Sequence, residues 1–253
     1  MPLTVHQFPC LSDNYGFLAR DEATGLTACI DTPDAGAILR ELKTLGWNLD
    51  MILNTHWHPD HAGGNAEIVA ATGATIVGPA EVTRISALDR EVRGGDAVML
   101  GETRFDVIET GGHTLGHIAY FDAADRIAFV GDTLFALGCG RLFEGTAEQM
   151  WTSLQRLAAL PDDTTVYCAH EYTASNARFA LSVDDDPALK ARAERVFALR
   201  KRGEPTVPTT IALEKATNPF LRAPKLAERV GAAGQPDYEA FGAVRAAKDV
   251  FKG

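Results

Sequence analysis

Cysteine is scarce in this chain, and its few occurrences are far apart. The four residues include no Cys-x-x-Cys pair and no dense cluster: Cys10, Cys29, Cys139 and Cys168. This spacing argues against the disulfide framework of a small secreted domain. We therefore expect four reduced thiols, mostly buried.

Long apolar runs are also missing. The first eight residues, Met-Pro-Leu-Thr-Val-His-Gln-Phe, lack the basic start and the continuous apolar segment of a secretory signal, and no later run is long enough to cross a bilayer. We expect a soluble, cytoplasmic protein with no membrane partner.

Positive charge is scarce in the first 186 residues and concentrated near the C-terminus. The net charge of −10 argues against nucleic acid as a partner. Residues 1–186 carry 11 basic and 27 acidic side chains, a balance of −16, whereas residues 187–253 carry 13 and 7, a balance of +6. The basic tail either docks on an acidic face or provides a positive field for a small anionic substrate.

Three common catalytic signatures are absent: the Gly-x-Ser-x-Gly elbow, the phosphate loop and the Gly-x-Gly-x-x-Gly dinucleotide motif. What the chain has is 253 residues with 46% hydrophobic content. This is enough for one large domain, or for one domain with a smaller appendage.

The most informative stretch is Thr55–His61, which reads Thr-His-Trp-His-Pro-Asp-His. It places three histidines and one aspartate within six residues, directly after an apolar run. Imidazole nitrogen and carboxylate oxygen are the ligands that divalent metals such as zinc prefer. We interpret the stretch as half of a dinuclear metal site rather than as a solvated polar loop.

The other candidate ligands share its setting. His113, Asp132 and His170 each lie just after a predicted strand, beside glycine or other small residues. Strand ends of a layered α/β fold meet along one edge, so these side chains can converge although they are far apart in sequence. Seven ligands suit two divalent ions that keep positions for water.

The pattern predicts two regions. Short strand signals and amphipathic helices alternate up to about residue 172, whereas the rest reads as helices with proline-rich joints. Within the first region we expect helices over 33–45, 61–72 and 147–160. We predict a catalytic domain of residues 1–172 and a helical substrate-binding domain of residues 173–253.

The ligand series resembles the motifs of the metallo-β-lactamase superfamily. The resemblance implies an α/β fold, an αββα sandwich with two metals at its edge and, here, a smaller all-helical C-terminal domain. It implies one metal on His56, His58 and His113, a second on Asp60, His61 and His170, and Asp132 as the bridge.

The sequence leaves the roles of three further polar residues undecided. We favour a structural or ligand-supporting role for His117 and a core or surface position for His6. Asp31 either braces a ligand or serves a turn.

Four other segments are similar to the glyoxalase II (hydroxyacylglutathione hydrolase) family, and they extend the resemblance over nearly the whole chain: Gly138–Thr146, His170–Thr173, Asn218–Arg222 and Arg245–Asp249. The family's glutathione-binding positions become Arg141, Phe143, Tyr172, Arg245 and Lys248. At Arg141 and Phe143 the family more often has lysine and tyrosine, so one hydrogen bond, worth roughly 0.5–1.5 kcal/mol, is missing at Phe143.

The resemblance implies hydrolysis of S-(2-hydroxyacyl)glutathione, typically S-D-lactoylglutathione, to glutathione and D-lactate. A metal-bridging hydroxide would attack, with Asp60 and Asp132 as catalytic residues. We expect two divalent ions, zinc first and iron or manganese as alternatives. Competing functions are another hydrolase of the superfamily (a lactonase or β-lactamase), a glutathione persulfide dioxygenase, and a non-catalytic metal-binding module. The oligomeric state stays open, with a monomer favoured.

Overall fold

The computed structural model describes residues 2–252, which form two compact units. The N-terminal unit comprises the residues up to Glu109 together with Gly116–Gly131. The C-terminal unit comprises Thr110–Leu115 together with the residues from Asp132 onward. This division groups residues 132–172 with the helical tail, so it differs from the boundary at residues 172 and 173, which stays a prediction.

Two sheets make up the centre of the N-terminal unit. In the first, β1 (Leu3–Cys10), β2 (Asn14–Asp21) and β3 (Thr27–Ile30) are antiparallel, and β4 (Met51–Leu53), β5 (Thr75–Gly78) and β6 (Arg90–Glu91) continue in parallel. In the second, β7 (Ala97–Leu100), β8 (Thr103–Glu109), β9 (Ile118–Asp122) and β10 (Ile127–Phe129) form an antiparallel meander. Short loops join β7 to β8 and β9 to β10, whereas the loop between β8 and β9 spans residues 110–117.

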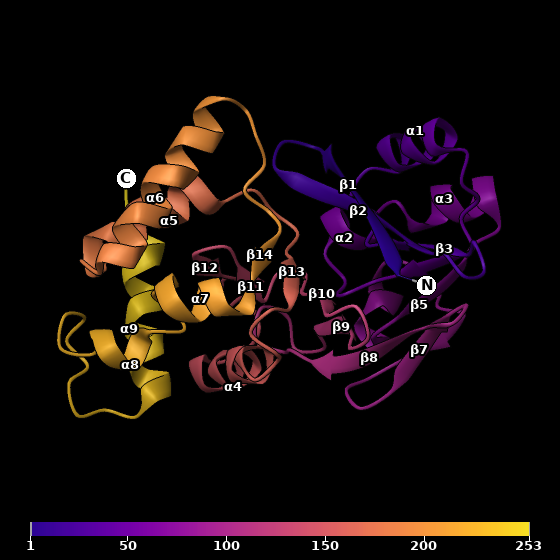
Figure 1. Cartoon of the computed structure of the whole chain (residues 1–253). Coiled ribbons are helices and arrows are strands. Elements are labelled where there is room, and N and C mark those ends of the chain that lie inside the picture. Colours follow the sequence, from indigo (N-terminus) through magenta and orange to yellow (C-terminus); the bar gives the residue numbers. More distant parts are fainter. Residues whose placement is uncertain (1, 253) are drawn as a thin grey trace. The chain divides into compact units, whose positions relative to one another are not determined.

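Helices cover the outer face of the first sheet. Helices α1 (Ala35–Leu45) and α3 (Asn65–Thr72) lie on the same side of its strands (Figure 1), where Ile38 and Ile68 join a core with Leu18 and Ile52. Asp34 caps the start of α1 by accepting a hydrogen bond from Ala37, and left-handed Gly46 ends the helix directly after residue 45, where the predicted helix over 33–45 ends.

The inner face of the first sheet packs against the second sheet. The rings of Phe17 and Phe129 lie 5.8 Å apart, and the buried Tyr120 hydroxyl donates to the carbonyl of Asn54 at 2.8 Å. The N-terminal unit is therefore a helix, sheet and sheet stack, and the ends of β3 and β4 lie where the predicted metal stretch begins.

The helix predicted over residues 61–72 is wrong in one respect. The structure has a short helix α2 (Pro59–Ala62) and then α3, separated by Gly63 and Gly64. A Cβ on Gly64 would lie 2.7 Å from the carbonyl oxygen of Thr32. The chain therefore approaches Thr32 at this point and leaves the helical path.

The C-terminal unit contains a small hairpin, β11 (Leu134–Phe135) and β12 (Gly138–Cys139), and six helices. Thr146 and Gln149 form a capping box at the start of α4 (Ala147–Ala158), which lies within the helix predicted over 147–160. The helices after α4 are α5 (Thr173–Val183), α6 (Pro187–Lys201), α7 (Ile211–Thr217), α8 (Ala223–Leu226) and α9 (Asp237–Val250).

Two packing relations organise this unit. Helices α5 and α6 lie side by side (Figure 1) over a buried cluster that includes Leu137, Ala177 and Leu189. The tail also contains one short strand that the sequence did not reveal, β14 (Thr209–Thr210), which pairs with β13 (Thr165–Tyr167).

All four cysteines are buried and none forms a disulfide, as predicted. Burial raises the pKa of Cys10 and Cys168 to about 12 and that of Cys139 to about 11. No helix within residues 2–252 is long and apolar enough to cross a membrane.

Candidate metal centre

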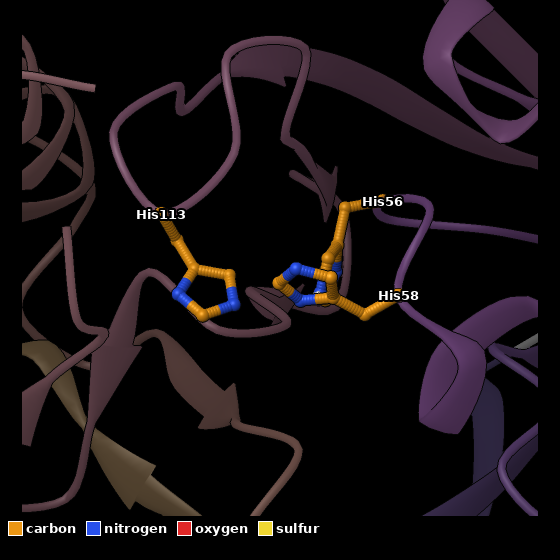
Figure 2. A group of neighbouring side chains, drawn as sticks. All are labelled: His56, His58 and His113. Atoms are coloured by element: carbon orange, nitrogen blue, oxygen red, sulfur yellow. The ribbon is translucent and has the colours of Figure 1, made fainter. Parts of the chain in front are cut away.

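The seven predicted ligands fall into two groups, one in each compact unit. The N-terminal group is His56, His58, Asp60 and His61, and the C-terminal group is His113, Asp132 and His170. Figure 2 shows His56 and His58 on the loop after β4 and His113 on the loop after β8.

The N-terminal group is compact because one loop and one helical turn supply it. The Nε2 atom of His56 lies 3.0 Å from Nδ1 of His58, and the two rings meet edge to face. Pro59 then begins α2, which carries Asp60 and His61. Proline is favoured at a first helical position because its fixed φ suits the helix.

Asp31 braces two histidines of this group. Its Oδ2 lies 2.8 Å from Nδ1 of His61. Thr55 donates its backbone N–H to Oδ1 and its hydroxyl to Oδ2 of Asp31, each at 2.7 Å. The Thr55 oxygen in turn lies 3.0 Å from Nδ1 of His56. Because a carboxylate only accepts hydrogen bonds, Nδ1 of His61 donates to Asp31. Because the Thr55 hydroxyl gives its proton to Asp31, Nδ1 of His56 donates to the Thr55 oxygen.

These hydrogen bonds determine which nitrogen of each imidazole is available to a metal ion. With Nδ1 protonated, Nε2 of His56 and Nε2 of His61 carry the lone pair that a divalent ion accepts. Between the two roles that the sequence left open for Asp31, the structure favours support of ligands. Asp31 itself has a left-handed φ of 58°, a conformation that is uncommon for residues other than glycine.

Asp60 is oriented by a residue that the sequence did not single out. Asn14, buried at the start of β2, donates from Nδ2 to the Asp60 carboxylate at 3.2 Å and to its carbonyl at 3.3 Å. The same carboxylate lies 3.6 Å from Nε2 of His61. Asn14 is almost fifty residues away from Asp60 in sequence, so no spacing rule would have found it.

His117 supports the N-terminal group by stacking on His56. It is fully buried, and its ring stacks on that of His56 with centroids 4.7 Å apart. A Cβ on Gly131 would lie 2.7 Å from Nε2 of His117, so glycine is required there, and its φ of 47° fits that requirement. His6 lies away from the group, 2.9 Å from Glu41 and stacked on Phe8.

In the C-terminal group, Asp132 lies between the two histidines. One carboxylate oxygen is 3.3 Å from Nε2 of His113 and the other is 3.3 Å from Nε2 of His170. The Nδ1 atom of His113 is 2.9 Å from the carbonyl oxygen of Arg141, which can only accept a hydrogen bond. Nε2 of His113 is therefore the nitrogen available to a metal.

The five predicted substrate-binding residues all belong to the C-terminal unit, but their exposure differs. Phe143 is 62% exposed and its ring meets His113 at 5.2 Å, while Tyr172, 38% exposed, stacks on His170 with rings only 3° from parallel. The Arg141 side chain is also mostly exposed. Aromatic surface thus flanks both histidines of the group.

Arg245 and Lys248 both lie on α9 and form hydrogen bonds within the C-terminal unit. Arg245 is 5% exposed and donates to the carbonyl of Cys139 at 3.0 Å and to Asp249 at 2.8 Å. Lys248 lies in the same helix and donates to Ser175. Partial burial lowers the pKa of the Lys248 amine, and the positive charges of Arg245, Arg141 and Arg178 lower it further.

The donor set fits divalent metal ions. It consists of imidazole nitrogens and carboxylate oxygens, and three histidines have their Nδ1 atoms held by hydrogen-bond partners, which is the arrangement that metal-binding histidines usually show. Such a set suits zinc, iron or manganese.

Comparison with known proteins shows the superfamily to which the chain belongs. A family model for the metallo-beta-lactamase superfamily matches residues 24–170, and one for the hydroxyacylglutathione hydrolase C-terminus matches residues 171–251. The predicted fold class, a metallo-β-lactamase domain followed by a helical domain, is confirmed. This superfamily and the histidine and aspartate clusters suggest a dinuclear metal site.

Curated relatives then define the family. The chain is 56% identical over 252 residues to a hydroxyacylglutathione hydrolase of Erythrobacter litoralis, covering 98% of this chain and 100% of the relative. It is 57% identical over 253 residues to that of Maricaulis maris, covering 98% and 99%. The chain belongs to the hydroxyacylglutathione hydrolase family, also called glyoxalase II.

Solved structures are similar as well. ETHE1 from Myxococcus xanthus matches with a TM-score of 0.67 and 29% identity over 98% of both chains. TTHA1623, solved in a di-iron-bound form, matches with a TM-score of 0.62 and 25% identity, covering 86% of this chain and 100% of that one.

Proposed function

We propose that this protein is a metal-dependent thioesterase that hydrolyses S-(2-hydroxyacyl)glutathione, typically S-D-lactoylglutathione, to glutathione and D-lactate. The observation that carries the proposal is identity above 55% over almost the whole chain to two hydroxyacylglutathione hydrolases. Because the metal motif serves many reactions, the match of the helical tail to the family's C-terminal region is what points to glutathione.

The proposed ligand allocation assigns one ion to His56, His58 and His113 and the other to Asp60, His61 and His170, with Asp132 between them. Its support within each unit is the 3.0 Å approach of His56 to His58 and the position of Asp132, 3.3 Å from each histidine of its group. We further propose zinc as the metal.

Two divalent ions held by these residues would lower the pKa of a water molecule and polarise the acyl oxygen of the substrate. Among the protein's own residues, Asp60 would orient the attacking water by accepting a hydrogen bond from it. Asn14 holds the Asp60 carboxylate in place. Asp31 holds the tautomer of His61. A thiolate leaves readily, because thiol pKa values lie near ~8.5, so a strong general acid is not required.

The C-terminal unit would bind the glutathione part. Glutathione carries two carboxylates, and Arg141, Arg245 and Lys248 provide positive charge while Phe143 and Tyr172 provide aromatic surface. The pKa of Lys248 is lowered first by burial and then by the charges of Arg245, Arg141 and Arg178, and the second contribution supports this assignment because it places several cations near one another. Arg245 is buried, and its Nε has no hydrogen-bond partner among residues 2–252.

The test is a substrate panel on purified protein loaded with two equivalents of zinc. We expect the thioester absorbance of S-D-lactoylglutathione to fall with a kcat/KM of at least about 10⁴ M⁻¹s⁻¹. A β-lactam, a lactone and glutathione persulfide with an oxygen electrode serve as comparisons. Faster turnover of any of these would replace the proposal with a lactonase, β-lactamase or persulfide dioxygenase function.

The proposal extends to the location, oligomeric state and partners of the protein. We propose a cytoplasmic location, a monomeric state and no nucleic-acid or membrane partner. Size-exclusion chromatography with light scattering measures the molecular mass, and a mass near twice 27.2 kDa would contradict a monomer.

A further inference from the structure

The hairpin β11–β12 links the two parts of the proposed site within the C-terminal unit. It begins two residues after Asp132 and ends two residues before Arg141. Each strand has only two residues, and its tip contains Leu137 with a left-handed φ of 58°. Two-residue strands and a strained tip do not hold their own conformation, so other groups must fix it.

Helix α7 and the residue that follows it provide these groups. Glu214 accepts a hydrogen bond from the backbone N–H of Leu137 at 2.9 Å. Asn218 donates from Nδ2 to the carbonyls of Phe135 and Gly138, at 3.1 Å and 2.9 Å, and to Glu214 at 2.9 Å. Both side chains are fully buried.

The buried charge of Glu214 is compensated. Its other carboxylate oxygen accepts from Arg192 and from the Thr209 hydroxyl. Arg192 also donates to Thr217 at 2.7 Å. A buried carboxylate with this many donors is strongly localised, and the hairpin that it grips is localised with it.

What the hairpin presents is the ring of Phe135. This ring meets His170 edge to face at 5.8 Å and Tyr172 at 5.5 Å, both at 87°. His170 and Tyr172 are themselves stacked in parallel. Phe135 is therefore the support against which a proposed metal ligand and a proposed substrate-binding residue rest.

We propose that Glu214 and Asn218 are positioning residues: they hold hairpin β11–β12 in the conformation in which Phe135 orients His170 and Tyr172. In this way the helical tail acts on the reaction without touching the substrate. The expected effect on KM rests on the proposed thioesterase function, whereas the expected effect on the positions of His170 and Tyr172 does not.

The experiment is a double-mutant cycle between Asn218→Ala and Phe135→Leu in the full chain. If Asn218 acts through Phe135, each single variant raises the KM for S-D-lactoylglutathione about fivefold, and the double variant stays within about twofold of the larger single effect. Lys215→Met is the matched control. It lies on α7 but pairs with exposed Asp162, so its KM stays unchanged.

Hydrogen exchange of the metal-free protein provides a readout that needs no substrate. Asn218→Ala should speed exchange of the amides of residues 134–143 and 170–172 at least about tenfold, and Lys215→Met should not. If Asn218→Ala does not fold, Asn218→Ser, which retains one donor, replaces it in both measurements.

The outcomes separate the two proposals. Multiplicative KM effects in the double variant, or unchanged exchange in residues 134–143 and 170–172, would overturn the positioning role. A wild-type enzyme that hydrolyses no glutathione thioester would overturn the proposed function, and the exchange comparison would still decide the role of Asn218.

Discussion

Asp31 accepts a hydrogen bond from Nδ1 of His61 at 2.8 Å, and through Thr55 it also fixes His56. One buried carboxylate thus sets the tautomer of two proposed ligands, one for each metal ion. Outer hydrogen-bond partners of this kind commonly change metal affinity by 10- to 100-fold.

Replacing Asp31 should weaken metal binding without removing a ligand. We expect Asp31→Ala to lower the zinc affinity by about 10- to 100-fold, because His56 and His61 lose their fixed tautomers. Competition with a chelating dye measures the affinity. The control is Asp162→Ala, which removes an exposed carboxylate. Equal affinities for the two variants would exclude the bracing role.

Asp132→Ala tests the proposed bridge. Since its two oxygens lie 3.3 Å from His113 and from His170, its loss should reduce the bound metal at both positions and the kcat by at least about a hundredfold. Elemental analysis after gel filtration gives the metal content. Retention of two equivalents of metal would show that Asp132 does not bridge.

Lys248 should make substrate binding depend on pH. Burial and neighbouring cations lower the pKa of its amine, so the amine loses its charge at lower pH than an ordinary lysine. Binding of a carboxylate needs the charged form, so we expect KM to rise with pH on the alkaline side. Lys248→Ala should raise KM at neutral pH and abolish this rise.

Lys248→Arg is the matched variant for that measurement, because an arginine side chain keeps its charge throughout the range. Its KM should stay nearly constant with pH. A wild-type KM that does not change between neutral and alkaline pH, or an unchanged KM in Lys248→Ala, would show that this side chain does not bind the substrate.

Phe143→Tyr should restore a hydrogen bond that the family more often has. The ring is 62% exposed, so the added hydroxyl meets no packing obstacle. A gain of about 0.5–1.5 kcal/mol corresponds to a KM lower by roughly 2- to 13-fold. Steady-state kinetics with S-D-lactoylglutathione measure it, and Phe143→Leu, which loses the aromatic face, should change KM in the opposite direction.

Local sequence signals predicted much of the fold. The Gly46 stop of α1 and the Thr146 cap of α4 are set by neighbouring residues, and the helices predicted over 33–45 and 147–160 agree with the observed ones to within two residues. The helix over 61–72 was predicted as continuous because the close approach of Gly64 to Thr32 involves a residue about thirty positions away. β14 was missed because two residues carry no periodicity.

By itself the sequence determined the kinds and order of the proposed ligands and the helical tail, because residue chemistry and short-range spacing encode them. Only the tertiary structure revealed the supports: Asp31 on His61, Asn14 on Asp60, and Asn218 on the hairpin that carries Phe135. It also showed that Arg245 is buried against Cys139. These relations join residues between 30 and 106 positions apart, and such hydrogen bonds depend on how the chain packs rather than on any local pattern.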